Sequence, residues 1–381
     1  MASFTMRSML SVFLVAALLT PGCRKKETEN VIKVGEIGSM TGAEATFGLS
    51  THEGVKLAMD EANAAGGING KKIEVISIDD QGKPEEAAIA MTKLITQNKV
   101  VAVIGEVASS RSLAIAPIAQ QYKVPMISPS STNPKVTQIG NYIFRVCFID
   151  PFQGTVMARF ALDTLKVKKL AIFRDVKNDY SVGLADFFKE TLLAGGGQVV
   201  ADQSYSAGDM DFKSQLTAIR TAEPEAVFIP GYYTDVGLIV RQARELGLTV
   251  PLLGGDGWDS PKLTEIGGAA MDGTYFSNHY SEEDKSPQVV SFIEKYKKAY
   301  GIVPNGISAL GYDAAMVLID ALKRTKSSSQ EDLRNAIAET KNFVGIGGKI
   351  TMDENRNPVK PAVVIKVQDG KFRYTATVEP K

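Results

Sequence analysis

Residues 100–110 read Val-Val-Ala-Val-Ile-Gly-Glu-Val-Ala-Ser-Ser, and this run contains the unit from which much of the chain is built. Its first five residues form a β-branched pattern typical of a buried strand, and Gly105 ends that pattern. The two serines then open a helical pattern that continues over residues 112–121. A strand that passes through a short turn into a helix is typical of a βαβ unit, so this run predicts a parallel sheet.

The same alternation extends to both sides of this run. Before and after it, the patterns predict strands at 32–37, 72–78 and 124–127 and helices at 53–65 and 84–97. A second series begins after Asp150, with strands at 169–173, 198–205, 226–229 and 250–253 and helices at 153–165, 181–193, 212–221 and 235–246. The predicted fold class is therefore α/β, with two doubly wound lobes that each contain a parallel sheet.

The C-terminal residues depart from this alternation. Helical patterns follow one another at 287–300, 308–323 and 330–340, and strand patterns at 362–367 and 372–378 flank a turn at Asp369-Gly370. Helices that return to the first sheet and strands that complete the second would make both lobes discontinuous. We expect residues 31–146 and 279–346 to form one lobe, and residues 147–278 and 347–381 to form the other. The chain would then cross between the lobes three times, near 144–148, 275–279 and 345–351, and these crossings would form a hinge.

The first 23 residues are predicted to be a signal segment. Arg7 precedes an apolar run over 9–19, which is about half of the ~20 residues that a membrane-spanning helix requires. The segment resembles a bacterial lipoprotein signal, in which cleavage before Cys23 leaves that thiol to be acylated, although Thr20 and Pro21 depart from the usual pattern. Ordinary export and an uncleaved anchor remain the alternatives. Residues 24–30 are charged and would form a tether.

Composition excludes several classes of protein. The chain of 381 residues has 43 Lys and Arg against 43 Asp and Glu, and it shows no basic stripe of the kind that nucleic-acid binding needs. Two cysteines and two histidines are too few for a disulfide scaffold or most metal sites, so no metal or cofactor is expected. Catalytic motifs such as a nucleophile elbow, a phosphate-binding loop or a zinc-protease signature are not found either, and we expect a protein that is not an enzyme.

Polar side chains follow two neighbouring predicted strands. Ser109 and Ser110 come after the strand at 100–104, and residues 127–134 (Ile-Ser-Pro-Ser-Ser-Thr-Asn-Pro) repeat the arrangement in the next strand-to-helix turn. Free backbone N–H groups and hydroxyls at helix N-termini bind anions, so two such turns side by side suit one small carboxylate. Helix capping alone would also favour Ser, Thr and Asn here. Ligands bind at the carboxyl ends of strands in open α/β sheets, which favours the carboxylate site.

The second predicted lobe offers complementary groups. Asp179-Tyr180, Gly231-Tyr232-Tyr233 and residues 254–258 (Gly-Gly-Asp-Gly-Trp) each follow a predicted strand. The tyrosines can stack on a ligand or form hydrogen bonds with it, and Asp256 can pair with a cation. Donors in one lobe that face an acid in the other would recognise a zwitterion.

With these features in view, the chain resembles the periplasmic leucine/isoleucine/valine-binding proteins of bacterial ABC importers, which have the type I periplasmic-binding fold. The resemblance covers essentially the whole length after the signal segment. It depends on short motifs that are specific only in combination, namely residues 37–42, 65–71, 79–80, 103–105, 127–134, Arg145 with Asp150, 153–154, 231–233 and 241–243.

The resemblance implies roles for individual residues. The family's carboxylate clamp falls on the side chains of Ser109 and Thr132, and backbone groups of Ser109 and Ser130 assist it. Ser131, next to Ser130 in the same motif, is also expected at the ligand. The family's acid for the ligand ammonium falls on Asp256, where better-known members carry Glu. Its aromatic contacts fall on Tyr180, Tyr232 and Phe47, and Trp258 stands beside the acid. A disulfide found in some members is missing, since Gly82 and Ala108 occupy its positions, and Cys147 is expected to be buried and unpaired.

The resemblance implies a solute-binding protein of the periplasm or cell envelope, anchored by a lipid on Cys23, that captures an aliphatic, branched-chain type amino acid and delivers it to an inner-membrane ABC permease. Two alternatives keep the fold: a ligand that is an amide, urea or aromatic acid, or a role as a ligand sensor. Asp256 is one methylene shorter than Glu, so the ligand's side chain stays open. The rest of the chain after the signal is expected to lie outside the cytoplasm.

Overall fold

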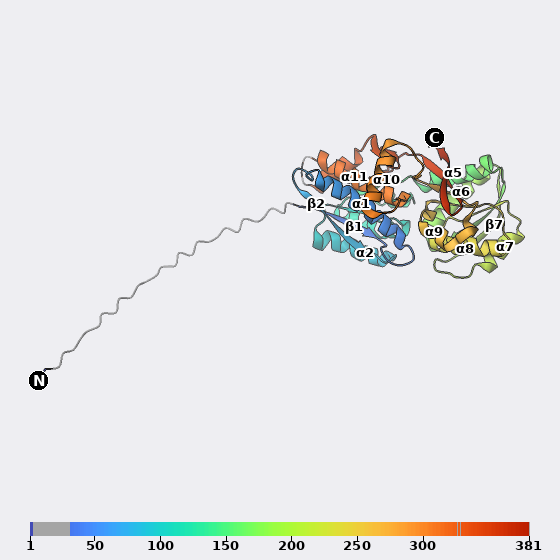
Figure 1. The fold of residues 1–381 in the computed structure, drawn as a ribbon, viewed down its shortest axis with the longest axis horizontal. Coiled ribbons are helices and arrows are strands. Elements are labelled where there is room, and N and C mark those ends of the chain that lie inside the picture. Colours follow the sequence, from blue (N-terminus) through green and yellow to red (C-terminus); the bar gives the residue numbers. More distant parts are fainter. Residues whose placement is uncertain (3–30, 326, 328, 381) are drawn as a thin grey trace.

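The computed structural model describes residues 1–2, 31–325, 327 and 329–380. The described chain forms two α/β lobes that lie side by side, one built around β1 and α1 and the other around β7 and α8 (Figure 1). Cys23 and the predicted tether lie outside the described residues.

A parallel five-stranded sheet forms the centre of the first lobe. Its strand order is β2 (Lys72–Asp79), β1 (Val31–Gly38), β3 (Ala102–Ile104), β4 (Met126–Ser128), β5 (Ile143–Arg145). The strands carry apolar side chains on both faces, because helices cover both faces of a doubly wound sheet. These helices include α1 (Ala45–Ala64), α2 (Pro84–Lys93), α3 (Ser109–Tyr122) and the short α4 (Lys135–Gln138).

The C-terminal helices return to this lobe, as the sequence predicts. They are α10 (Pro287–Tyr300), α11 (Gly306–Arg324) and α12 (Gln330–Ala338), and α10 and α11 lie beside α1 (Figure 1). A hairpin of β11 (Phe343–Gly345) and β12 (Gly348–Ile350) follows them, and Ile350 and Met352 belong to the same hydrophobic core.

A seven-stranded mixed sheet forms the second lobe. Its order is β14 (Lys371–Val378), β13 (Ala362–Gln368), β10 (Tyr275–Asn278), β9 (Leu252–Gly254), β8 (Ala226–Phe228), β6 (Lys169–Asp175), β7 (Gln198–Tyr205). The pairs from β10 to β7 are parallel, and β13 and β14 add an antiparallel edge. The helices of this lobe are α5 (Asp150–Arg159), α6 (Asp179–Ala194), α7 (Lys213–Thr221), α8 (Tyr233–Glu245) and α9 (Pro261–Gly267). Two α/β lobes built on parallel strands therefore confirm the predicted fold class.

Three passages of the chain join the lobes. The first follows β5 and the second follows β10, close to the predicted ranges. The third lies nearer to Lys360, because residues 343–352 still pack on the first lobe. The buried Lys360 ammonium donates to the Val146 carbonyl (3.3 Å), so it ties the third passage to the first.

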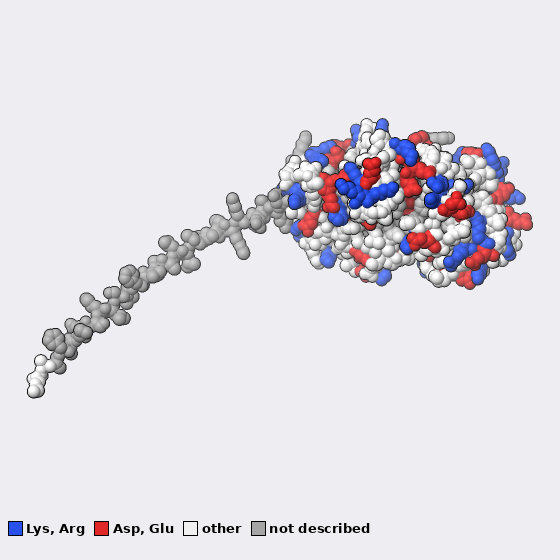
Figure 2. All heavy atoms as spheres, viewed as in Figure 1, with Lys and Arg blue, Asp and Glu red and all other residues white. Residues whose placement is uncertain are grey.

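The surface of the described part carries charges of both signs, interspersed over both lobes on the face shown in Figure 2. This distribution agrees with a formal net charge of zero. None of the helices in the described ranges combines the length and apolar character that crossing a membrane requires.

Candidate ligand-binding site between the lobes

A small, narrow cavity lies between the lobes. The first lobe contributes Phe47, Val107, Ser109, Ser130 and Ile307 to its wall, and the second contributes Tyr180, Tyr232, Asp256 and Gly257. Six of the nine residues predicted to bind ligand therefore line one cavity: Phe47, Ser109, Ser130, Tyr180, Tyr232 and Asp256. Thr132, Ser131 and Trp258 lie outside its wall.

The two serine-rich turns form the polar wall of the first lobe. Helix α3 begins at Ser109, and the Ser109 hydroxyl accepts a hydrogen bond from the Asn133 N–H (3.3 Å), which joins the two turns. Thr132 is fully buried, and its hydroxyl lies near the Asp150 carboxyl but forms no hydrogen bond of good geometry with the residues that the structure describes. An unsatisfied buried hydroxyl is costly, so this atom is available to a bound group.

Ser131 has a different environment from its neighbours. Its hydroxyl lies within hydrogen-bond distance of the carbonyls of Glu106 (3.0 Å) and Val107 (2.9 Å), and of the Ser112 hydroxyl (2.7 Å). These contacts hold the two turns against each other. The Ser131 hydroxyl therefore forms its hydrogen bonds inside the first lobe and does not face the cavity.

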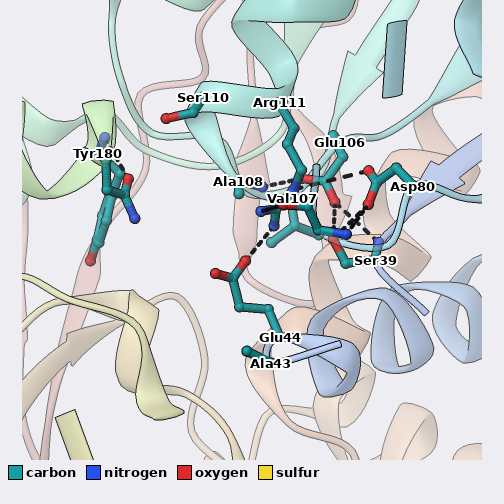
Figure 3. Close-up of polar contacts among 12 residues, drawn as sticks. Ser39, Ala43, Glu44, Asp80, Glu106, Val107, Ala108, Ser110, Arg111 and Tyr180 are labelled. Atoms are coloured by element: carbon teal, nitrogen blue, oxygen red, sulfur yellow. Dashed lines mark hydrogen bonds and ion pairs between the residues drawn. The ribbon is translucent and has the colours of Figure 1, made fainter. Parts of the chain in front are cut away.

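A buried charge cluster supports the Ser109 turn from behind. The Arg111 guanidinium forms ion pairs with Glu44 (2.6 Å) and Glu106 (3.2 Å), and Asp80 lies nearby (3.9 Å); Figure 3 shows these acids gathered around it, with Tyr180 set apart on another element. The Glu106 carboxylate also accepts from the Ala108 N–H. Burial raises the pKa of Glu106 to about 7, although the Arg111 charge opposes this shift.

Asp256 is the acid of the second lobe, directly after β9 and Gly255. Gln153 holds it at two points: its Nε2 donates to Oδ1 (3.0 Å), and its Oε1 accepts from the Asp256 N–H (2.8 Å). His279 Nε2 lies 2.9 Å from Oδ2, and the Ser130 hydroxyl reaches across from the first lobe at 3.4 Å. The side chain is therefore held in one orientation at the cavity.

Aromatic rings form much of the remaining wall. Tyr180 and Tyr232 stack, with ring centroids 5.3 Å apart and planes at 9°, and Phe47 meets Tyr232 edge to face at 5.4 Å. The Tyr180 hydroxyl accepts from the Gly257 N–H (3.1 Å). Trp258 points away into the core of the second lobe, where its Nε1 donates to the Ile229 carbonyl (3.0 Å).

Sequence reasoning did not assign Gln153 or His279 to the site. In the sequence, Gln153 lies in a short motif and His279 lies within a predicted chain crossing. Both contact Asp256 from more than 20 positions away, and no local pattern marks such a partner. The expected free cysteine is confirmed: Cys147 is buried and unpaired.

Two α/β lobes joined by three passages, with polar and aromatic groups from both facing one cavity, define a two-lobed binding protein for a small solute. The chain belongs to the periplasmic binding protein family, whose profile matches residues 31–371.

Named relatives support this membership. The chain is 31% identical over 344 residues to the Leu/Ile/Val-binding protein homolog 3 of Brucella melitensis, which covers 90% of this chain and 92% of the relative. It is similar in structure to the leucine binding protein LivK of Thermotoga maritima (44% identity, TM-score 0.88, 92% of this chain and 99% of the other). The LivJ substrate-binding protein of Streptococcus pneumoniae, solved in complex with isoleucine, has the same TM-score of 0.88 at 35% identity, over 92% of this chain and 100% of the other.

Proposed function

We propose that this protein captures a branched-chain type aliphatic amino acid between its lobes and delivers it to the permease of an ABC transporter. Relatives named for leucine, isoleucine and valine, including one solved with isoleucine, support this ligand class. The protein binds and releases its ligand unchanged in this proposal, and acts as no enzyme.

The observation that carries the proposal is the pairing of opposite chemistries across the cavity. Ser109 and Ser130 present hydroxyls from the first lobe, where the buried Thr132 hydroxyl belongs to the same turn as Ser130, and the Asp256 carboxylate faces them from the second lobe. In the proposal, the hydroxyls and turn amides bind the ligand carboxylate, and Asp256 binds its ammonium. A buried carboxylate is tolerated only with good partners, and a ligand cation would complete the set around Asp256.

The rest of the wall suits an aliphatic side chain. Phe47, Val107, Ile307 and the stacked tyrosines are apolar or aromatic and present no charge to a ligand side chain. Burying an aliphatic side chain such as leucine's is worth roughly 1.5–3 kcal/mol, so alanine and glycine would bind less tightly. The unpaired charge of lysine or glutamate would be unfavourable there.

We also propose that the protein works in the periplasm or cell envelope, held to the membrane by a lipid on Cys23. The family to which the chain belongs and the lipoprotein-like signal support this location. Mass spectrometry of the N-terminal peptide from a membrane fraction would show the acyl mass on Cys23, and replacing Cys23 by Ser should release the protein; an unmodified Cys23 would contradict anchoring.

A calorimetric ligand panel tests the ligand class. We expect leucine, isoleucine and valine to bind more tightly than alanine, lysine or glutamate. Ser109→Ala and Thr132→Ala should each weaken the best ligand by about ten- to a hundredfold, since a hydrogen bond to a charged group contributes ~1.5–3 kcal/mol. Thr92→Ala, on the exposed face of α2 and away from the cavity, is the control. Binding of benzoate-like acids or acetamide in place of the aliphatic amino acids would contradict the proposal.

A further inference from the structure

His279 is a buried residue that contacts the acid of the site without lining the cavity. It directly follows β10, its side chain is fully buried, and its Nε2 lies 2.9 Å from Asp256 Oδ2. The imidazole stacks on the Phe148 ring with centroids 3.6 Å apart and planes at 27°. The second ring nitrogen, Nδ1, is buried and has no hydrogen-bond partner within the described ranges.

These contacts define the protonation state of the ring. A carboxylate oxygen only accepts, so Nε2 must carry the proton and donate to Asp256. A second proton on Nδ1 would bury an N–H group with no acceptor, which is costly. Burial lowers the pKa of His279 below its ordinary value, and the Lys360 charge acts in the same direction. The Asp256 carboxylate favours protonation but does not overcome them. The imidazole is therefore neutral at neutral pH.

We propose that His279 is the positioning residue that makes the cavity specific for a ligand with a cationic group, because it fixes Asp256 with a donor that brings no charge. This inference rests on the proposed function and extends it to a residue behind the ligand. A Lys or Arg at this place would neutralise Asp256 and leave little attraction for an ammonium. The neutral Nε2–H fixes Oδ2 while the carboxylate keeps its full negative charge for the ligand.

The position of His279 also connects this acid to the hinge. His279 begins the second passage between the lobes, and Phe148, on which it stacks, belongs to the first passage, shortly after β5. One packed contact thus joins two of the three passages to Asp256. The orientation of the acid is set by residues that form the hinge itself.

The test compares two variants whose side chains at position 279 have similar lengths. His279→Gln places an amide nitrogen where Nε2 stands, and His279→Met has the same reach but no donor. Affinities for leucine and for its deaminated analogue, 4-methyl-2-oxopentanoate, are measured by calorimetry with the full chain. We expect His279→Met to lower the ratio of leucine to keto-acid affinity at least tenfold, and His279→Gln to restore most of that loss. Loss of packing alone would weaken both ligands together and leave the ratio unchanged.

A ratio unchanged in His279→Met, or equally low in both variants, would overturn the inference. If His279→Met fails to fold, His279→Asn, whose amide is too short to reach Oδ2, replaces it with the same expectation.

A ligand-free measurement separates this inference from the proposed function. The chain has two histidines, so ¹⁵N spectra of the parent and of His52→Gln assign the His279 ring directly. We expect a neutral ring protonated at Nε2 at pH 7, and an imidazolium or an Nδ1–H tautomer would refute the inference. If the parent binds no branched-chain amino acid, the proposed function is wrong. The spectrum still measures the protonation state of His279 in that case, because it needs no ligand.

Discussion

At the scale of single residues, the structure contains several acids that are buried with few partners. Burial raises the pKa of Asp150 to about 8 and that of Asp259 to about 7. Asp259 accepts a backbone hydrogen bond from Gly306, whereas Asp150, at the start of α5, receives little compensation beyond the nearby Thr132 hydroxyl and Arg145 charge. Near neutral pH, Asp150 is therefore largely protonated in the folded protein.

The raised pKa of Asp150 makes the free energy of unfolding depend on pH. The folded-state pKa of Asp150 lies above its ordinary value of 3.8, so its contribution to stability is complete below that value and is lost as the pH rises through about 8. Asp150→Asn keeps the shape and removes this titration. Relative to the variant, the parent should lose up to ~1.4 kcal/mol of unfolding free energy per pH unit between about pH 5 and 8.

Urea denaturation of both proteins across this pH range measures the difference. Asp163→Asn, on a side chain that is 64% exposed, is the control and should follow the parent. Parallel curves for the parent and Asp150→Asn would show that the buried acid does not titrate as expected.

At the scale of residues, the sequence predicts groups on both sides of the cavity but not the residues that hold Asp256 in place. Ser109, Thr132 and Asp256 follow strands and belong to recognisable motifs, so their positions could be predicted. Gln153 and His279 belong to the site only because they contact Asp256, which lies 103 and 23 positions away in the sequence. Trp258 is the opposite case. Its position close to Asp256 in the sequence suggested a ligand contact, but in the structure its side chain lies in the core of the second lobe.

At the scale of elements, the pairing of α1 with α11 joins segments more than 240 residues apart. The helices approach closely at two glycines: a Cβ on Gly54 would lie 2.1 Å from the Ser308 carbonyl oxygen, and one on Gly311 would lie 2.6 Å from that of Thr51. Backbone atoms cannot move aside as side chains can. A methyl group at either position must push the helices apart.

We therefore expect Gly54→Ala to lower the unfolding free energy by about 1–3 kcal/mol, even though alanine favours a helix more than glycine does. Lys56→Ala, on the exposed side of the same helix, should change it by less than about 0.5 kcal/mol. Equilibrium urea unfolding provides both values. A Gly54→Ala protein as stable as the Lys56 control would show that the helices accommodate the methyl group without cost.

At the scale of the whole molecule, polar contacts join the lobes around the cavity. The Ser110 hydroxyl meets the Asp179 carboxylate (2.8 Å), the Thr46 and Ser260 hydroxyls lie 2.8 Å apart, and Asp259 Oδ2 accepts from the Gly306 N–H (2.7 Å). The first two contacts are exposed or half-buried and individually weak, since water competes for each partner, whereas the contact of Asp259 with Gly306 is buried. A ligand that contacts both lobes would add the differential energy that favours this closed arrangement.

Small-angle X-ray scattering tests whether the lobes move. We expect the radius of gyration of the parent to decrease when saturating leucine is added, because three passages permit opening of the lobes and the ligand groups are divided between them. Asp256→Ala at the same leucine concentration, where binding is weak, should show no such decrease. The same scattering profile for the parent with and without a ligand proven to bind would argue for a rigid cavity.

The sequence by itself determined the alternation of strands and helices, the return of the C-terminal helices and strands, and the turns that carry the serines and Asp256. Each of these follows from local periodicity, from turn chemistry or from motifs that the chain carries in order. Only the tertiary structure decided that Ser131 and Trp258 serve the protein interior, that Lys360 ties two passages together, and that Gln153 and His279 orient Asp256. The physical reason is that a hydrogen-bond partner is selected by proximity in space, and residues distant in sequence become neighbours only when the sheets and passages have formed.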